Sequence, residues 1–552
     1  MNRTKTLVIL IAAAFAATPV LANEREHLEL LRQTTLNLID ALVESGALPK
    51  EKADGLLKAA EKKAAKTVRE NTSMEPKPVR VQYVPETVKN EIREQLKQEV
   101  LAQAKNERWA EPNAVPEWLD RIKWEGDIRL RYQTESYPQG NTPAKDFDTP
   151  IPGFGSLTRA ADVGAANSFN VNTGNTEDDR SRLRLRARLG MLARVSDSWS
   201  AGIRLATGNS TDRVSTNQSL GQNFNKYQLM LDRAYLKYDP ADWLSISGGR
   251  IPNPWYGMDV VWDEDINFEG LAATLKPIIK ADAPFRPFLT VGAFPMRESS
   301  PPVANSRWIY GGQLGGHWNL GRSTNFKFGL AYYKFQGLEG HVIPSNEFFN
   351  AADPKDNAYT SPDYRRYEYE SGLRQKGNTL FATNALTDSS LKTIWGLASK
   401  FSPVVLSAGL DIGRFDPVHL ILEGEYAKNT AFDRDEISRR TGYVLTDGKS
   451  HAYQVRMTVG MPQLKAVNDW QVYGGYRYVG SDSVVDAFTD SDFGLGGTNL
   501  KGYFLGARYG VDRNAFLNIR MLSADTIDSP TLIDSAHKFG VDVIQADVNV
   551  RF

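Results

Sequence analysis

The sequence of 552 residues contains no cysteine, only six histidines and no excess of charge of either sign. The lack of cysteine excludes a disulfide scaffold, thiolate metal sites and a cysteine nucleophile. Lys+Arg and Asp+Glu balance at 66 each, so the net charge favours no nucleic-acid partner. The mean hydropathy is −0.42, and no long apolar run follows the N-terminal region, which excludes a bundle of membrane helices.

Enzyme signatures are also missing. The six histidines, at positions 27, 317, 341, 419, 451 and 537, form no recognisable spacing with a serine or a carboxylate, and neither a Gly-rich phosphate loop nor an HExxH motif occurs. We therefore expect no catalytic residues, no metal site and no cofactor.

The N-terminal region has the pattern of a secretory signal peptide. Arg3 and Lys5 precede the apolar run "LVILIAAAFAA", and small residues follow Pro19. The run is short for a membrane span, so we interpret residues 1–22 as a signal peptide, with a retained anchor as the alternative.

The following segment, residues 23–107, is helical in pattern. Leu28, Leu31, Thr35, Leu38 and Leu42 are spaced 3, 4, 3 and 4 residues apart, as in a short heptad seam. The pattern predicts a coiled-coil-like region in the periplasm, followed by a linker at 108–123. The seam either packs against its own neighbouring helices or supports self-association, and a homotrimer is the expected assembly.

From Trp124 onward, the spacing of polar and apolar residues changes to a period of two. The stretch "DRSRLRLRARLGMLARV" has arginine at 180, 182, 184, 186 and 188, with leucine or alanine at 183, 185, 187 and 189. In a strand, successive side chains point to opposite faces, so all five guanidiniums would share one face. The segment is therefore predicted to have one wet, positive face and one apolar face.

Similar segments recur to the end of the chain, separated by linkers that alternate between long and short. We predict 16 strands, near residues 124–133, 180–195, 198–208, 227–238, 243–251, 266–276, 285–294, 308–318, 325–335, 393–413, 418–428, 451–461, 469–479, 501–511, 515–523 and 540–552. The number depends on treating 393–413, which Pro403 interrupts, as one strand, and 18 strands is the alternative. Long loops at one rim and tight turns at the other are typical of an outer-membrane barrel, here residues 124–552, with both chain ends in the periplasm.

The last strand carries a further signal. In "VIQADVNVRF", apolar residues alternate with polar ones up to the aromatic Phe552. Together with a signal peptide, this ending resembles the C-terminal signature by which the barrel assembly machinery recognises outer-membrane proteins.

Three local runs carry a resemblance to a known family: "GRIPNPWYG" at 249–257, "INFEGLA" at 266–272 and "LDRAYLKY" at 231–238. On these runs and on the order of its regions, the chain over residues 23–552 resembles the putative porin family of Gram-negative outer membranes. The resemblance implies a diffusion channel and assigns no functional residues.

The predicted inward faces are rich in ionic side chains. An ionised group in a dry core costs several kcal/mol unless it is paired, so a water-filled lumen is expected, and a barrel of about 16 strands is wide enough for one. The sequence therefore predicts a porin for small polar or anionic solutes, surrounded by outer-membrane lipid. The alternative is a structural tether, with the barrel as anchor and the helices as a periplasmic arm. A TonB-type receptor is disfavoured, because it needs a globular plug and about 22 strands.

The arginines suggest a selectivity. The first strands should be neighbours, so a positive wall that attracts anions is predicted; it comprises Arg129, Arg131, Arg182, Arg184, Arg186, Arg188 and Arg204. The opposing interpretation is that loop or lumen carboxylates, including Asp127, Glu423 and Glu425, neutralise it; Asp547 is a further acidic residue expected to line the pore. Two linkers are candidates for an inward constriction or for surface loops, namely 336–392, the longest, and 134–179.

Overall fold

The computed structural model describes residues 121–143, 157–159, 175–277, 283–298, 306–321, 323–342, 366–370, 372–383, 394–442, 444–446, 448–529 and 537–552. The expected signal peptide, the helical region with its Leu28–Leu42 seam and nearly all of the linker lie outside these residues. No helix in the described part of the chain is both long and apolar enough to cross a membrane.

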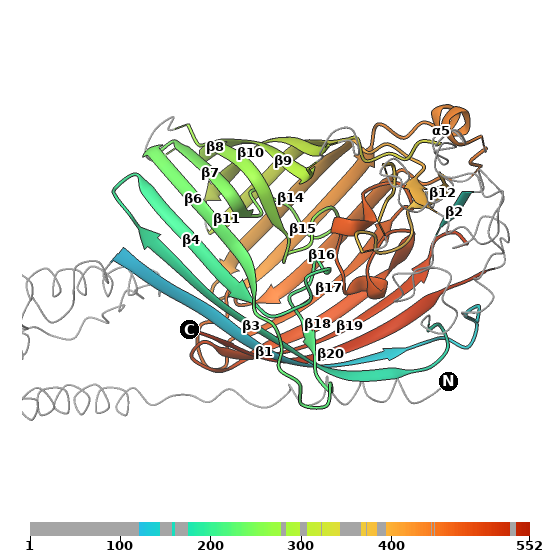
Figure 1. Ribbon diagram of the computed structural model, residues 1–552. Coiled ribbons are helices and arrows are strands. Elements are labelled where there is room, and N and C mark those ends of the chain that lie inside the picture. The colour runs from blue at the N-terminus through green and yellow to red at the C-terminus, as the bar shows by residue number, and fades with distance from the viewer. Residues whose placement is uncertain are drawn as a thin grey trace, which may run out of the picture. The chain divides into compact units, whose positions relative to one another are not determined.

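The described residues form a closed, 16-stranded antiparallel β-barrel (Figure 1). Its strands are β1 (Ile122–Ser136), β3 (Arg180–Arg194), β4 (Trp199–Ala206), β6 (Met230–Ala241), β7 (Leu244–Pro252), β8 (Asn267–Leu275), β9 (Phe285–Arg297), β10 (Arg307–Gly321), β11 (Thr324–Gln336), β14 (Pro403–Phe415), β15 (Val418–Asn429), β16 (His451–Gly460), β17 (Trp470–Val479), β18 (Leu500–Asp512), β19 (Ala515–Thr526) and β20 (Gly540–Arg551). The predicted architecture and strand number are confirmed.

The barrel closes where its first and last strands meet. β1 pairs with β3 on one side and with β20 on the other. The pairing extends to the last residue, because the amide of Gly126 donates to the carbonyl of Phe552 at 2.9 Å and the amide of Phe552 donates to the carbonyl of Gly126 at 3.0 Å. A Cβ atom at position 126 would lie 2.5 Å from the Phe552 ring, so the glycine lets this ring cover the seam. The sheet therefore has no open edge, as a barrel in lipid requires.

One predicted strand was wrong in its extent. The segment 393–413 does not form a single strand, because β14 begins at Pro403. Proline has no amide hydrogen to donate to a ladder and is tolerated as the first residue of a strand. The preceding residues form β13 (Trp395–Leu397), which pairs with β12 (Thr379–Ala382); β12 in turn pairs with β2 (Leu157–Arg159) in a separate three-stranded sheet.

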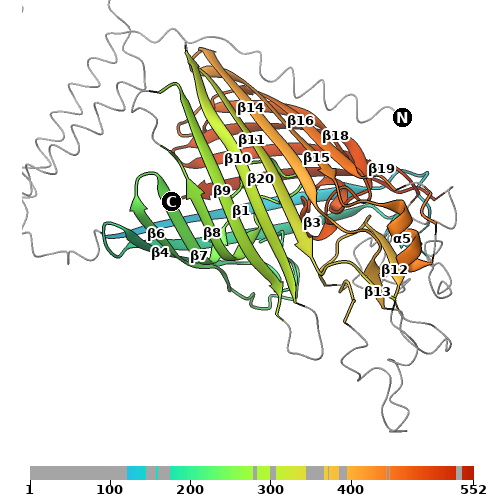
Figure 2. The ribbon, with the colours of Figure 1, turned by 90° about the horizontal axis from the view of Figure 1, so that it is seen from above.

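Long connections gather at one end of the barrel, together with this small sheet and helix α5 (Arg434–Thr441) (Figures 1 and 2). The opposite end has short turns, such as those at 195–198 and 513–514, and the end of β20. The two-residue strand β5 (Gln218–Ser219) pairs with β3 within the long connection that follows β4.

The two faces of the barrel wall differ in the way that the alternation predicts. On β1, Ile128, Leu130 and Tyr132 are 45–48% exposed, whereas Arg131 between them is 1% exposed. On this strand, large apolar side chains thus face outward and polar side chains face inward. Near the short turns the outer face carries aromatic pairs, such as Trp199 and Tyr238, whose rings stack at 4.5 Å; this is the position of an interfacial girdle.

Two long connections fold into the barrel, and we call them the inward loops: residues 253–266 after β7 and residues 480–499 after β17. The first crosses the lumen, because Tyr256 bonds to Gln313 on β10 while Asp259 accepts from Gln454 on the distant strand β16. The second contains two short 3-10 turns, η5 (Asp486–Phe488) and η6 (Phe493–Leu495).

Aromatic packing explains why the first inward loop turns inward. The ring of Trp255 contacts Tyr333 at 5.1 Å, and that of Trp262 contacts Phe268 at 4.9 Å. These rings belong to the buried apolar core of the molecule, which therefore lies inside the barrel against β8–β11. Of the two linkers considered for a constriction, 336–392 contributes the described residue Tyr369, whose hydroxyl donates to Asp486 of the second inward loop.

The outward face yields a direct test. Met457 lies in the middle of β16 and is 52% exposed, so Met457→Arg places a charge in lipid and should reduce the free energy of unfolding by about 2–4 kcal/mol. Urea titration of the barrel refolded into vesicles measures this change. Met457→Leu is the matched control and should behave as the wild type; an equally stable arginine variant would show that this face is not in lipid.

Candidate functional site

The inward loops hold each other inside the barrel. The Asp263 amide donates to the Phe488 carbonyl at 2.8 Å, and the Thr489 hydroxyl donates to the Val260 carbonyl at 2.8 Å. The Ser491 amide in turn donates to the Asp263 carboxylate at 3.0 Å. The two loops therefore form one body that narrows the lumen.

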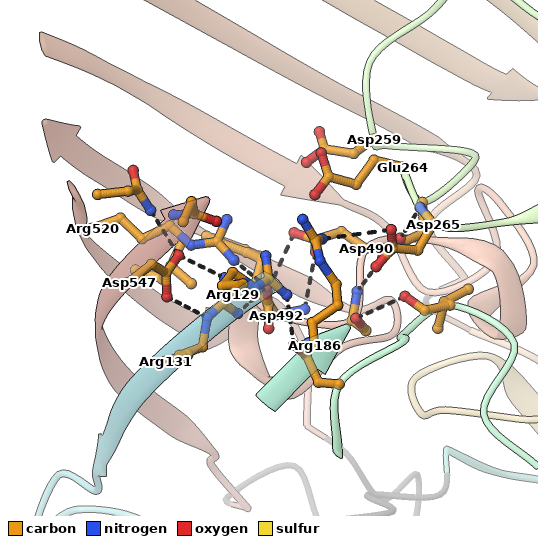
Figure 3. A pocket seen from close by; sticks show the side chains of 18 of the residues that line it. Arg129, Arg131, Arg186, Asp259, Glu264, Asp265, Asp490, Asp492, Arg520 and Asp547 are labelled. Atoms are coloured by element: carbon orange, nitrogen blue, oxygen red, sulfur yellow. Dashed lines mark hydrogen bonds and ion pairs between the residues drawn. The ribbon is translucent and has the colours of Figure 1, made fainter. Parts of the chain in front are cut away.

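A cavity of about 450 Å³ remains between this body and the barrel wall (Figure 3). Its lining is strongly ionic, with eleven arginines and seven carboxylates. The arginines all come from barrel strands, namely Arg129, Arg131, Arg186, Arg188, Arg204, Arg233, Arg456, Arg477, Arg508, Arg520 and Arg551. Six of the carboxylates belong to the inward loops, namely Asp259, Asp263, Glu264, Asp265, Asp490 and Asp492, and the seventh is Asp547 on β20. Charges of opposite sign thus face each other across the cavity.

Asp492 is the centre of the first ionic cluster. It accepts from Arg131 at 3.0 Å, forms an ion pair with Arg520, and lies 4.0 Å from Arg184. Arg131 also binds Asp547, with Nε 2.7 Å from Oδ1. Burial alone would raise the pKa of Asp492, but Arg131, Arg520 and Arg184 hold it well below its usual range. The carboxylate is therefore ionised and fixes the second inward loop to β1 and β19.

A second cluster joins the first inward loop to β1 and β3. Asp127 lies 3.0 Å from Arg186 and 2.6 Å from Arg188, and Asp265 lies 3.8 Å and 2.8 Å from the same two guanidiniums. The pKa of Asp265 is lowered although burial opposes this, because Arg186 and Arg188 favour the charged form.

The other arginines of the predicted wall also have partners. Arg182 pairs with Glu135 and Arg204 with Asp232. Arg129 donates to the Asn217 side chain at 2.6 Å. The structure thus brings the seven arginines together on β1, β3 and β4, but six of them meet a carboxylate within 4.0 Å.

The acidic residues named from the sequence have different partners. Asp127 and Asp547 meet arginines of the wall, whereas Glu423 pairs with Arg456 at 2.7 Å. Glu425 binds no arginine in the described part of the chain: it accepts from the Ser407 hydroxyl and the Met258 amide, both at 2.7 Å. Because Met258 belongs to the first inward loop, Glu425 anchors that loop to β15.

Two acids of the inward loops have a raised pKa. Burial raises the pKa of Asp263 well above its ordinary value, and the nearby charges of Asp490, Asp265 and Glu264 raise it further. Burial also raises the pKa of Asp490, although Arg477, which lies 2.6 Å away, acts in the opposite direction; the charges of Asp259 and Asp492 add to the increase.

Sequence reasoning missed the carboxylates of the inward loops. The signal that could have found them is their clustering, as "WDED" at 262–265 and "DSD" at 490–492, in two linkers assigned to the same rim. Among the described residues, no group of three His, Cys, Asp or Glu side chains is arranged to hold a metal ion.

No curated protein matches this sequence. Among solved structures, the chain is similar to the outer-membrane channel DcaP of Acinetobacter baumannii, with 11% identity and a TM-score of 0.37, over 78% of this chain and 97% of that one. OprB of Pseudomonas putida is 11% identical, with a TM-score of 0.41 over 79% and 96% of the two chains. OmpF of Salmonella typhi, in complex with daunomycin, is 8% identical, with a TM-score of 0.38 over 78% and 97%. At these TM-scores, the similarities carry no information on function.

The family comparison is more informative. Residues 32–552, nearly the whole chain, match the family described as "putative porin". Two of the runs that carried the resemblance, 249–257 and 266–272, overlap or adjoin the inward loop at 253–266. The resemblance is confirmed: the chain belongs to the putative porin family of outer-membrane β-barrel proteins.

Proposed function

We propose that the barrel is a water-filled channel through which small polar solutes diffuse passively, with a preference for anions. The observation that carries the proposal is the ionic cavity between the inward loops and the wall. Its eighteen charged side chains would be costly in a dry core, whereas a hydrated lumen keeps their exposed edges in water.

The excess of arginine supports the preference for anions. Eleven guanidiniums line the cavity against seven carboxylates, and three more carboxylates, Asp127, Asp232 and Glu423, pair with Arg188, Arg204 and Arg456 from outside the lining. The low-dielectric wall of a pore focuses the field of the smaller positive excess that remains. Burial also raises the pKa of two of these acids, Asp263 and Asp490, so that they lose their charge at a higher pH than an ordinary aspartate does. The local potential is therefore more positive than the balanced composition of the whole chain implies.

The lengths of the loops at the two rims indicate how the barrel is oriented in the membrane. In barrels of this class, short turns face the periplasm and long loops face outward, so we place the end of β20 and the region before β1 in the periplasm. There Phe552 would be read by the barrel assembly machinery, and the helical region would be free to associate. Trimerisation through the Leu28–Leu42 seam stays a prediction.

Single-channel recording in planar bilayers tests the function. The purified protein should give stable current steps in KCl, and a salt gradient should give a reversal potential of the sign expected for anions. A barrel that inserts without current would favour the tether instead, and a cation-selective current would contradict the preference.

The inward-loop carboxylates predict a charge variant. Asp492→Asn removes the charge that Arg131, Arg520 and Arg184 share, so the reversal potential should shift further toward anions. It should also loosen the second inward loop, because breaking a buried ion pair costs about 3–5 kcal/mol. Asp433→Asn is the matched control: Asp433 caps helix α5 at the outer rim, asparagine caps equally well, and selectivity should not change. A shift toward cations in Asp492→Asn would contradict the assignment.

The raised pKa values of Asp263 and Asp490 predict a dependence on pH. A carboxyl whose pKa is raised takes up its proton as the pH falls from neutrality, before an ordinary aspartate does. Between pH 7 and pH 5 the lumen should therefore become more positive, and the preference for anions should increase, while Asp492 stays ionised. In Asp263→Asn the preference should already be higher at pH 7, and the change with pH should be smaller; an unchanged pH response in this variant would exclude Asp263 as a source.

A further inference from the structure

We propose an oxyanion-binding site in the cavity, formed by Arg508 on β18 and Arg551 on β20, for the carboxylate or phosphate group of a small solute. The inference rests on the proposed channel function, because it assigns the place where a permeating anion binds. It differs from the predicted wall of seven arginines between Arg129 and Arg204, which lies on β1, β3 and β4.

These two arginines have no anionic partner. Among the described residues, no carboxylate oxygen lies within the 4.0 Å of an ion pair from either guanidinium. Arg508 makes one long hydrogen bond, 3.4 Å to the Gln471 side chain. Both side chains are exposed within the barrel, whereas Arg131 of the paired cluster is 1% exposed. Their N–H groups are thus available to a solute without the breaking of an existing ion pair.

Each of the two guanidiniums is supported by an aromatic ring. Arg551 lies over the Phe516 ring at 4.6 Å, and Arg508 lies over the Tyr473 ring at 5.2 Å. The Tyr473 hydroxyl donates to the Asn518 side chain at 3.2 Å, which fixes the ring. A guanidinium stacked on a ring keeps the N–H groups of its edge free for an acceptor, and their planar fork matches a carboxylate or a phosphate.

A glycine makes this support possible. Gly506 is the direct partner of Tyr473 across β17 and β18, and a Cβ there would lie 2.3 Å from the Tyr473 ring. The ring therefore lies along the inner wall, instead of standing upright in the lumen. The arrangement leaves space above the ring for the Arg508 guanidinium.

The local charge at this place is positive. Asp127 is opposite Arg551 in the register, but Arg186 and Arg188 already bind both of its oxygens. The guanidinium of Arg551 interacts electrostatically with Arg508, Arg186 and Arg188. The nearest carboxylate is thus shared among more cations than it can neutralise, and an added oxyanion would relieve their repulsion.

Inorganic phosphate is the probe that tests the site. Added to the channel at constant KCl, it should reduce the open-channel current in a concentration-dependent way. In the double variant Arg508→Gln plus Arg551→Gln, the half-blocking concentration should rise at least about tenfold, as expected for the loss of charge-assisted hydrogen bonds. An unchanged half-blocking concentration would overturn the proposal.

The matched control is Arg194→Gln plus Arg513→Gln. It removes the same two charges from the end with short turns, outside the cavity lining, and should change the half-blocking concentration less than twofold. A loss of block equal to that of the test variant would mean that phosphate responds to overall charge, which also overturns the site. Arg508→Lys plus Arg551→Lys keeps the charge without the planar fork and should give an intermediate value; block at wild-type strength would overturn the assigned geometry.

The channel and the site can fail separately. A wild-type current that phosphate leaves unchanged overturns the site and leaves the proposed function intact. If the wild type carries no current, the proposed function fails, and calorimetric titration of the detergent-solubilised barrel with phosphate still decides the site. Heat-modifiable migration on gels verifies that each variant forms a barrel.

Discussion

The ion pairs between the inward-loop carboxylates and the arginines of the wall are the interaction on which the lumen depends. Asp492 and Asp265 each reach more than one guanidinium, so each holds a loop in place and neutralises part of the wall. Such pairs are weak sources of net stability, because both ions lose hydration, but breaking one leaves an uncompensated charge. The loops therefore stay in place because their release would leave arginines and carboxylates unpaired.

The inside of the barrel is accordingly divided into two halves. Against β8–β11, aromatic side chains such as Trp255 and Trp262 bury the first inward loop in an apolar core. Against β1, β3 and β16–β20, the same loops present carboxylates to arginines across water-accessible space. The apolar half holds the loops rigidly, and the ionic half supplies the charged side chains that line the cavity. A solute is therefore confined to the ionic half.

The sequence predicted the barrel well, because the signals concerned are local. The alternation of side chains has a period of two within each strand, and tight turns join neighbours, so strand ends and facing directions follow from short windows. Asp492 could not be assigned to Arg131 in this way: the residues are 361 positions apart, and the linker that carries Asp492 has no periodicity. Glu425 shows the same limit in part: Ser407 is its direct neighbour across β14 and β15, but its contact with Met258 follows from the path of a loop and not from its own strand.

The arginine ladder on β3 shows why the number of like charges is a poor guide to selectivity. Five arginines in alternation are conspicuous in a sequence, yet the field that a solute meets depends on the charges left uncompensated after folding. Arg186 and Arg188 share two carboxylates, Asp127 and Asp265. The positive charge that these two arginines present to a solute is therefore reduced. Arg508 and Arg551 are not part of such an alternation of arginines in their strands, but among the described residues they face the lumen without a carboxylate within ion-pair distance. Whether an arginine is paired with a carboxylate depends on the closed barrel. Barrel closure and the inward path of the loops together determine which charged side chains lie within ion-pair distance.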